Sequence, residues 1–215
     1  GTISGNAITY GAETVLTSSS NGSGMALTKL DATHFVIAYG LSGTNVGKAV
    51  VGTVSGTVIS VGSEYTFNSA ETYSISISSL DATKFVVAFL DGGNSNYGTA
   101  MVGTVSGNTI TYGSEYTFTM QNYNDVSVVS LDANRFVIGY RDRQNNRYGT
   151  AKIGDVSGSV ITFGSAYVFN SGMTDYVKAS KLDSDHFVVG YRDISNSNYS
   201  TTVIGTLSGN TISFG

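Results

Sequence analysis

The stretch KFVVAFL, Lys84–Leu90, decides which fold the chain can adopt. It is rich in aromatic and β-branched residues, which favour strands. A sheet with one solvated face alternates apolar with polar residues. Because successive side chains of a strand point to opposite faces, this segment is apolar on both: Phe85, Val87 and Phe89 on one face, and Val86, Ala88 and Leu90 on the other. The stretch therefore predicts a strand in a small sheet that is covered on both sides.

The same stretch recurs along the chain. LDATHFVIAY, LDATKFVVAF, LDANRFVIGY and LDSDHFVVGY begin at Leu30, Leu80, Leu131 and Leu182. The string GTxSG, with the variant GDVSG, begins every 51 residues, at Gly1, Gly52, Gly103, Gly154 and Gly205. A fixed period of this length indicates a repeat architecture. We predict a single domain, 1–215, of four units, 1–51, 52–102, 103–153 and 154–204, with a tail, 205–215, that duplicates the head.

Each unit is expected to contain four strands separated by turn residues, and no segment has a helical period. In the second unit the expected strands are Tyr73–Leu80, Lys84–Leu90, Tyr97–Val105 and Thr111–Phe118. Small antiparallel sheets stacked face to face around an axis form a β-propeller. We therefore predict an all-β propeller of four-stranded antiparallel blades, four blades in this chain. The first strand of each blade, with its small serines, is expected to lie innermost.

Composition narrows the classes of function. The chain has no Cys, so it offers no disulfide, thiolate nucleophile or thiolate metal ligand. With 11 basic residues and a net charge of -4, it lacks the basic footprint of a nucleic-acid-binding protein. No apolar run reaches the roughly 18 residues of a membrane-spanning helix. We expect no cofactor, no nucleic-acid partner and no membrane span.

The unit GTVSGNTITYGSEYTF, followed by LDATKFVVAF and DGGNSNYGTA, resembles the highly repetitive β-propeller blades of bacterial and phage surface proteins. The resemblance covers the whole chain. More distantly, the chain is similar to propeller lectins built from near-identical blades. It departs from these lectins in having no Trp, a common sugar-stacking residue, so their sugar sites are not carried over by position. The resemblance implies a binding or adhesion role outside the cell.

Candidate catalytic residues are few. His34 and His186 stand where other units have Lys84 and Arg135, so we expect surface side chains beside a turn aspartate. An Asp that starts a tight turn accepts backbone N–H groups and fixes the hairpin register. No Ser-His-Asp order or acid–base constellation emerges, and we predict that the protein is not an enzyme. The turn aspartates are Asp31, Asp81, Asp132 and Asp183.

A polar loop after the second strand is the best candidate for ligand binding. It has an Asp, an Asn three residues later and a Tyr six residues later; the first unit lacks the pattern. Two arginines flank it in the later units, Arg141 and Arg192, and Arg143 and Arg147 add charge to the third. The three sets are Asp91, Asn94 and Tyr97; Asp142, Asn145 and Tyr148; and Asp193, Asn196 and Tyr199.

These loops have three interpretations. Carboxylate, amide and phenol groups suit sugar hydroxyls, and the arginines suit a carboxylate or sulfate on an acidic ligand. Carboxylate and amide oxygens also suit Ca²⁺, but the spacing is not that of a known calcium loop, and we predict no metal. The third interpretation is purely structural, an Asx-stabilised hairpin.

We therefore expect a non-enzymatic binding or adhesion module with carbohydrate as its ligand class. The alternative is a purely structural repeat protein, such as a fibre or spacer segment or an engineered scaffold, without a ligand. The Gly, Ser, Thr and Asn content with only 12% charged residues favours an extracellular location or a cell or virion surface. A hydrolase is disfavoured by the missing acid–base groups.

The duplicated head bears on ring closure. The head strand, Ile8–Leu16, has no first strand before it in its own unit, and the tail stops before the equivalent of Glu64–Phe67. The head is therefore expected to complete the last blade. This happens either in a monomeric closed ring, which effective concentration favours, or in a homodimer whose two chains share one eight-bladed ring.

Overall fold

The computed structural model describes residues 1–16, 21–120 and 125–215. Over these ranges the chain is all-β, with one 3-10 turn at Gly92–Asn94 and no α-helix. No helix in the described part of the chain is long and apolar enough to cross a membrane.

The strands form four antiparallel groups, which we call meanders 1 to 4. Meander 1 contains β3 (Asn21–Lys29), β4 (His34–Leu41), β5 (Val46–Ser55), β6 (Val58–Val61) and the start of β7 (Tyr65–Ser79). Meander 2 contains the end of β7, β8 (Lys84–Asp91), β9 (Tyr97–Ser106), β10 (Thr109–Tyr112) and β11 (Tyr116–Thr119). Meander 3 contains β12 (Val126–Asp132), β13 (Arg135–Asp142), β14 (Tyr148–Ser157) and the start of β15 (Val160–Lys181). Meander 4 contains the end of β15, β16 (His186–Asp193), β17 (Tyr199–Ser208) and β18 (Thr211–Phe214).

The meanders are not four separate sheets, so that part of the prediction is wrong. Strand pairing gives three sheets, of nine, seven and two strands. The reason is that β7 and β15 each pass from one meander into the next. Tyr65, near the start of β7, pairs with Ala49 of β5, whereas Ile77, near its end, pairs with Val87 of β8. The connection between meanders is itself extended, and the ladders therefore merge.

The second strands of meanders 1 to 3 are buried on both faces, as Lys84–Leu90 predicts, whereas β16 of meander 4 is buried on one face only. Val86 and Val87 point in opposite directions and are both 0% exposed. One apolar cluster, which includes Val36 and Val87, lies between meanders 1 and 2. Another, which includes Val86 and Ile138, lies between meanders 2 and 3. A third lies between meanders 3 and 4. The core of the protein is therefore a series of contacts between meanders.

The GTxSG string is explained by two separate demands on its glycines. The last glycine, such as Gly107 with φ +58°, lies in the left-handed region in the turn after the third strand. The first glycine, such as Gly103, lies beneath a ring of the second strand, where an added Cβ would be 2.2 Å from Cζ of Phe85. The same ring-on-glycine pair recurs as Phe35 on Gly52, Phe136 on Gly154 and Phe187 on Gly205.

Hydroxyl groups connect the first strands of successive meanders. Ser76 Oγ and Ser78 Oγ of β7 accept hydrogen bonds from the backbone N–H groups of Val128 (3.0 Å) and Ser130 (2.9 Å) of β12. These strands therefore lie side by side on the inner side of the stack, as predicted. Similar bonds run from Ser79 N–H to Thr28 Oγ1 and from Ala179 N–H to Ser127 Oγ.

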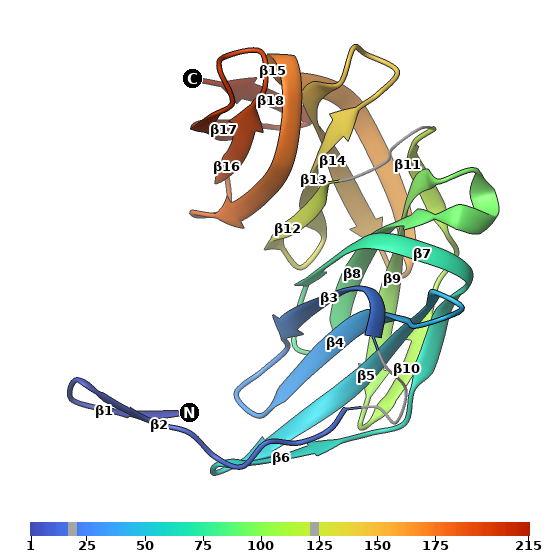
Figure 1. The fold of residues 1–215 in the computed structure, drawn as a ribbon, viewed down its shortest axis with the longest axis vertical. Coiled ribbons are helices and arrows are strands. Elements are labelled where there is room, and N and C mark those ends of the chain that lie inside the picture. The colour runs from blue at the N-terminus through green and yellow to red at the C-terminus, as the bar shows by residue number, and fades with distance from the viewer. Residues whose placement is uncertain (17–20, 121–124) are drawn as a thin grey trace.

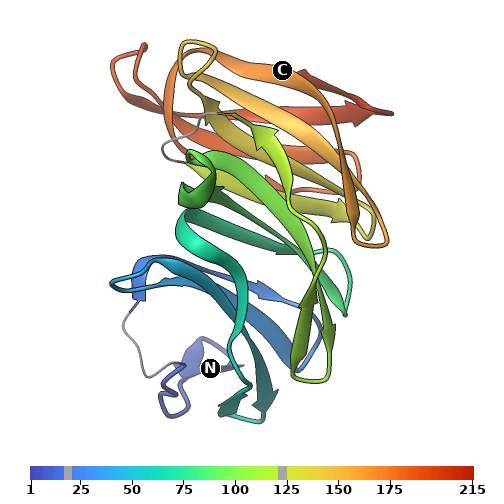
Figure 2. The same ribbon diagram turned by 90° about the vertical axis from the view of Figure 1, so that its right-hand side faces the viewer.

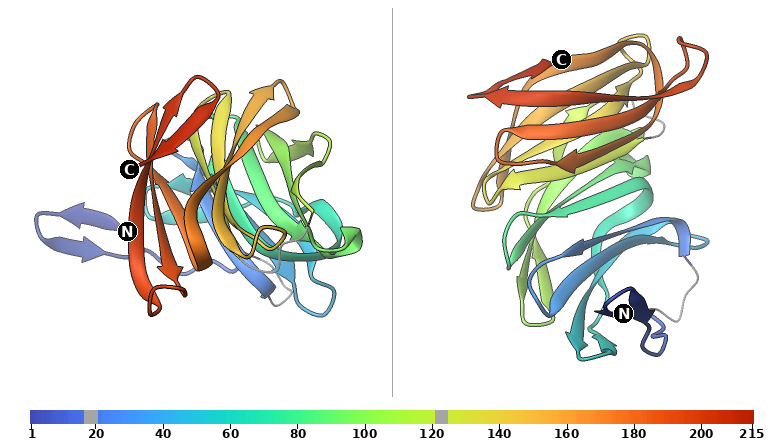
Figure 3. Two further views of the ribbon diagram at one scale, coloured as in Figure 1. Left: turned by 90° about the horizontal axis from the view of Figure 1, so that it is seen from above. Right: turned by 90° about the vertical axis from the view of Figure 1, so that its left-hand side faces the viewer.

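The four meanders follow one another along an open arc, with meander 1 at one end and meander 4 at the other (Figures 1 and 2). Figure 3 shows the same order from above and from the opposite side. The head forms a hairpin of its own, β1 (Thr2–Ser4) with β2 (Ala7–Thr9), and β18 pairs with β17. The prediction that the head completes the last blade within one chain is therefore wrong for this structure, because the arc keeps the two ends apart.

Replacing Gly103 by Ala should destabilise the protein by about 1–3 kcal/mol, because the new methyl group would displace the buried Phe85 ring. The matched control is Gly164→Ala, where the nearest atom to an added Cβ is 3.8 Å away, and stability should change by less than about 1 kcal/mol. Urea unfolding measures both. Equal stability of the two variants would show that the ring does not lie on the glycine.

Candidate functional site

The turn aspartates have the structural role that the sequence predicts. Asp31 Oδ1 accepts hydrogen bonds from the N–H groups of Thr33 (2.7 Å) and His34 (2.8 Å), and its Oδ2 lies 2.9 Å from His34 Nδ1. The Thr33 backbone N–H and the other bonds lower the pKa of Asp31 to about 2. His186 lies against Asp183 in the same way. These histidines are turn residues, and the Thr33 hydroxyl, 3.1 Å from His34 Nδ1, donates a hydrogen bond to the same turn carboxylate of Asp31.

Acid should weaken these turns. The backbone N–H of Asp185 and the His186 side chain lower the pKa of Asp183, as Thr33 and His34 lower that of Asp31. A carboxyl group with a depressed folded-state pKa stabilises the fold above its unfolded pKa near 4 and loses that contribution as pH falls towards 2. Urea midpoints should therefore fall between pH 5 and pH 2. The double variant Asp31→Asn with Asp183→Asn should be less stable at pH 6 and lose less on acidification; a parallel pH dependence would contradict this role.

The three Asp-Asn-Tyr sets lie in separate hairpins and do not form one site. Asp91 is 6% exposed, and its Oδ1 accepts hydrogen bonds from Asn68 Nδ2 (3.1 Å) and Gly93 N–H (2.9 Å). Asp142 and Asp193 accept from backbone N–H groups of their own loops. Tyr97, Tyr148 and Tyr199 pair with these aspartates across each hairpin, Asn94 ends a 3-10 turn, and Asn145 and Asn196 lie in turns.

Arg141 and Arg192 come together on an acidic residue that the sequence analysis did not select. Arg141 Nη1 and Arg192 Nη2 bind the two carboxylate oxygens of Asp175, the second at 2.7 Å. The Arg192 guanidinium also lies 4.6 Å from the centre of the Tyr176 ring, and Asp125 accepts the Tyr176 N–H at 2.8 Å. The two arginines thus share one carboxylate, with the Arg141 side chain 12% exposed and the Arg192 side chain 36% exposed.

This cluster should contribute to stability. Asp175→Asn keeps the shape of the side chain but leaves the largely enclosed Arg141 guanidinium, 12% exposed, and the partly exposed Arg192 guanidinium without their carboxylate, at a cost of about 1.5–3 kcal/mol. The matched control is Asp155→Asn, because Asp155 binds Arg135 where both side chains are about a third exposed, and such pairs contribute about 0–1 kcal/mol. Chemical denaturation should rank the two variants in this order. The reverse order would show that the cluster is not held by Asp175.

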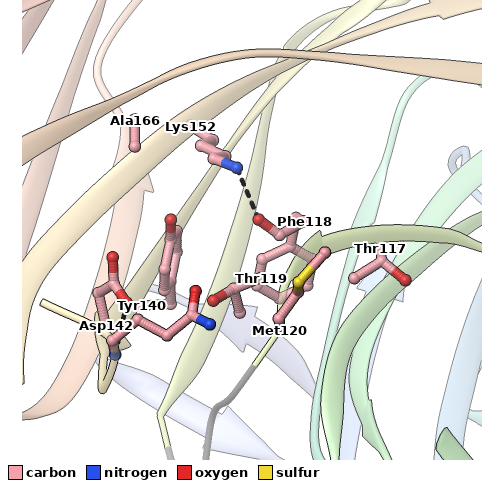
Figure 4. Close-up of a pocket in the computed structure, with 9 residues that line it drawn as sticks. Thr117, Phe118, Thr119, Met120, Tyr140, Asp142, Lys152 and Ala166 are labelled. Atoms are coloured by element: carbon pink, nitrogen blue, oxygen red, sulfur yellow. Dashed lines mark hydrogen bonds between the residues drawn. The ribbon is translucent and has the colours of Figure 1, made fainter.

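The most distinctive cavity lies between meanders 2 and 3, with a volume of about 330 Å³. Tyr140 and Asp142 come from β13, Lys152 from β14, and Thr119 and Met120 from the end of β11 and the residue after it (Figure 4). Lys152 Nζ donates a hydrogen bond of 2.7 Å to the carbonyl oxygen of Phe118. The remaining lining residues are Thr117, Phe118, Gln144 and Ala166. We call this cavity the Lys152 pocket.

The pocket exists because this contact departs from the repeat. Fifty-one residues before Lys152 stands Met101, which is 4% exposed within an apolar cluster. Fifty-one residues before Thr119 stands Asn68, whose amide donates to Asp91, the equivalent of Asp142. Because Thr119 is shorter than Asn68, the Asp142 carboxylate lacks the amide that the preceding meander provides to Asp91. Lys152 also replaces the apolar Met101.

Burial shapes the electrostatics of the pocket. Burial lowers the pKa of Lys152, and the Asp142 carboxylate opposes this by favouring the ammonium form. Burial raises the pKa of Tyr140, and Asp142 raises it further. Tyr140 therefore remains a neutral phenol, which both donates and accepts hydrogen bonds. The pocket thus combines an ammonium donor, a carboxylate acceptor, a phenol and the apolar surface of Phe118 and Met120.

The chain is similar to β-propellers. The Aleuria aurantia lectin, a fungal lectin with a six-bladed propeller fold, superposes with a TM-score of 0.60 at 9% identity over 97% of this chain and 62% of that chain. A mutant of the NanB sialidase from Streptococcus pneumoniae superposes with a TM-score of 0.59 at 17% identity, over 76% of this chain and 26% of that chain. Sqt1 from Chaetomium thermophilum gives 0.52 at 13% identity, over 87% of this chain and 59% of that chain.

These similarities concern the fold alone. The chain spans about a quarter of the length of the sialidase and less than two thirds of the lectin. No protein-family model and no curated protein matches the sequence.

Sequence reasoning found one member of the Lys152 pocket, Asp142, and missed the rest. The signal was present: Lys152 is the residue that breaks an apolar series of Met101 and Val203 at 51-residue spacing. Asp175 gave no such signal, because its equivalent in the second unit is Tyr73. In the described ranges no three His, Asp or Glu side chains are arranged to hold a metal ion.

Proposed function

We propose that the four meanders are the blades of a β-propeller and that the chain is a non-enzymatic carbohydrate-binding module with its site in the Lys152 pocket. The observation that carries the proposal is a lysine placed in a contact between meanders where its equivalents are apolar. Burying an ammonium group costs free energy, and perturbed ionisable groups gather at functional sites.

The chemistry of the pocket suits a sugar. A monosaccharide presents hydroxyl groups that donate and accept hydrogen bonds around a ring with apolar C–H faces. The Lys152 ammonium donates, the Asp142 carboxylate accepts, and the Tyr140 phenol does both. Met120, 57% exposed, supplies apolar surface, whereas the Phe118 side chain that also lines the pocket is 1% exposed. A volume of about 330 Å³ lies at the lower end of the range for small-molecule sites.

The architecture supports the same class of function. The Aleuria aurantia lectin is a propeller that recognises fucose, and we propose that this chain uses the same fold for a related task as an extracellular or surface adhesion module. Among the described residues that line the pocket, Asp142 is the one carboxylate, whereas glycoside hydrolysis usually needs a pair of carboxyl groups. The proposal is therefore binding without hydrolysis.

The test is binding to an array of immobilised glycans, followed by titration calorimetry with the best free sugar. The wild-type chain should bind at one site per chain. Lys152→Met, which installs the residue found at position 101, should weaken binding about tenfold or more, because a charged hydrogen bond is lost.

The matched control is Lys48→Met, since Lys48 also reaches a neighbouring outer strand, with its Nζ 2.7 Å from Thr66 Oγ1, but lies outside the pocket. It should bind like the wild type. If no glycan binds, or if Lys152→Met binds as well as Lys48→Met, the proposed site is wrong. Release of free sugar from the bound glycan would show that the protein is an enzyme.

A further inference from the structure

The outward face of meander 4 exposes residues whose equivalents are buried. Leu182 is 56% exposed, whereas Leu80 and Leu131 are 7% and 0% exposed. Ile204 is 46% exposed, whereas Val102 and Ile153 in the same position are 0% and 1% exposed. In meanders 2 and 3 these positions face the next meander. Meander 4 therefore presents an interface with nothing on it.

The outward face of meander 1 shows the complementary exposure. Leu27 is 61% exposed, whereas its equivalent in meander 2, Ile77, is 8% exposed against meander 1. Met25 is 60% exposed, whereas Val177, its equivalent in meander 4, is 0% exposed against meander 3. A contact between neighbouring meanders occurs three times within the arc. In the described part of the chain, the outward faces of meanders 1 and 4 are thus the two sides of one more contact of this kind.

The shapes of the two faces also match. At the contact of meanders 3 and 4, Val177 lies over Gly139, where an added Cβ would be 3.1 Å from Val177 Cγ1. The next position in this series is Gly190, beside a groove of about 380 Å³ on the outward side of meander 4. Met25 is the equivalent of Val177, so it is the side chain that would enter this groove. Of the two glycines in this series, Gly190 has the more open surroundings, with the nearest atom 4.0 Å from an added Cβ, and Met25 has the longest side chain of the opposing series.

A strand edge is open on the same face of meander 4. The third strands β5, β9 and β14 pair with an outer strand at Ala49, Ala100 and Ala151, opposite Tyr65, Tyr116 and Tyr167. On β17 the equivalent residue is Thr202, and β18 pairs with β17 only from Gly205 to Ser208. Among the strands of the described residues, none pairs with the outer side of β17 from Tyr199 to Val203.

The sequence that fits this edge is the head segment, Ala12–Leu16. Its residues Glu13 to Leu16 align at 51-residue spacing with Glu64 to Phe67, the outer strand of meander 1. Phe67 of that strand packs on Phe89 of the following meander at 5.1 Å between ring centres. Leu16 already packs on the cluster of Ile37, Tyr39 and Val50 in meander 1, and Tyr39 is the equivalent of Phe89. The head segment thus lies where the outer strand of a preceding meander belongs.

We infer that meander 4 of one copy of this chain packs on meander 1 of a second copy, whose residues 12–16 become the missing outer strand on β17. Each copy has both faces, so the contact can repeat head to tail, and the inferred assembly is the smallest such closed ring, in which two copies cover each other's ends. The contact buries the exposed leucine, isoleucine and methionine side chains and pairs Val15 with Thr201 and Thr14 with Thr202.

Engineered cysteines test the register directly, because the chain has no cysteine of its own. Paired residues in an antiparallel ladder have Cα separations of about 4.5–5.5 Å, within the range of a disulfide. Chains carrying only Thr14→Cys are mixed with chains carrying only Thr202→Cys and oxidised. A covalent dimer should form in the mixture. The control mixture replaces Thr14→Cys by Val160→Cys, at the first residue of β15 and 50% exposed, and should give little dimer.

Light scattering gives the second readout. The wild-type mass should be twice 22.4 kDa and should not depend on concentration. Ile204→Asp should halve it, because a charge would enter the apolar contact, and Val160→Asp should leave it unchanged. Both variants should keep the β circular dichroism of the parent.

A wild-type mass near 22.4 kDa without cross-linking would overturn the inference. If a single chain that carries both cysteines then forms an internal disulfide, the head closes on its own chain. A series of higher masses would overturn closure by two copies. Glycan binding at the Lys152 pocket is measured separately, so neither proposal depends on the outcome of the other.

Discussion

The packing of one two-faced strand between two neighbouring sheets is the interaction on which the rest of the structure depends. Val86 and Val87 are adjacent in sequence, completely buried, and part of different clusters. A meander with such a strand cannot be stable alone, because burying one face leaves the other in water. The repeat, the merged sheets and the exposed ends all follow from this requirement, since every meander needs a neighbour on both sides.

The contacts between meanders are not identical, and the Lys152 pocket lies where the repeat is broken. The contact between meanders 1 and 2 is closed by Met101 and by the bond from Asn68 to Asp91. The next contact has Lys152 and Thr119 in these places, and a pocket opens. Two substitutions in the lining of one contact turn structural packing into a polar cavity, without any change in the strands that hold it.

Much of the fold could be predicted from the sequence, because it depends on residue patterns that repeat within this one sequence. The 51-residue spacing, the two apolar faces of Lys84–Leu90 and the turn role of Asp31 all reflect local or repeated chemistry. The merging of sheets through β7 could not be predicted, because its connecting residues include Asn68 and Ser69, which are typical of turns, and their extended path depends on both neighbouring meanders. The site was only partly predicted. Asp142 belongs to the Asp-Asn-Tyr motif, which can be recognised in the sequence. The role of Lys152 in the pocket depends on the packing of meander 2 against it, which the sequence alone does not show.

The two proposals together determine how the protein would present its sites. The Lys152 pocket lies between meanders 2 and 3, away from the outward faces of meanders 1 and 4, so assembly would neither cover nor complete it. At the contact between copies, the equivalents of Lys152 and Asp142 are Val50 and Leu41, which offer no polar groups, so that contact would be structural only. A two-copy ring would therefore carry two identical pockets related by two-fold symmetry. Weak single-site binding to a glycan-coated surface would then gain avidity from the ring geometry, since the second pocket binds at the effective concentration set by the first.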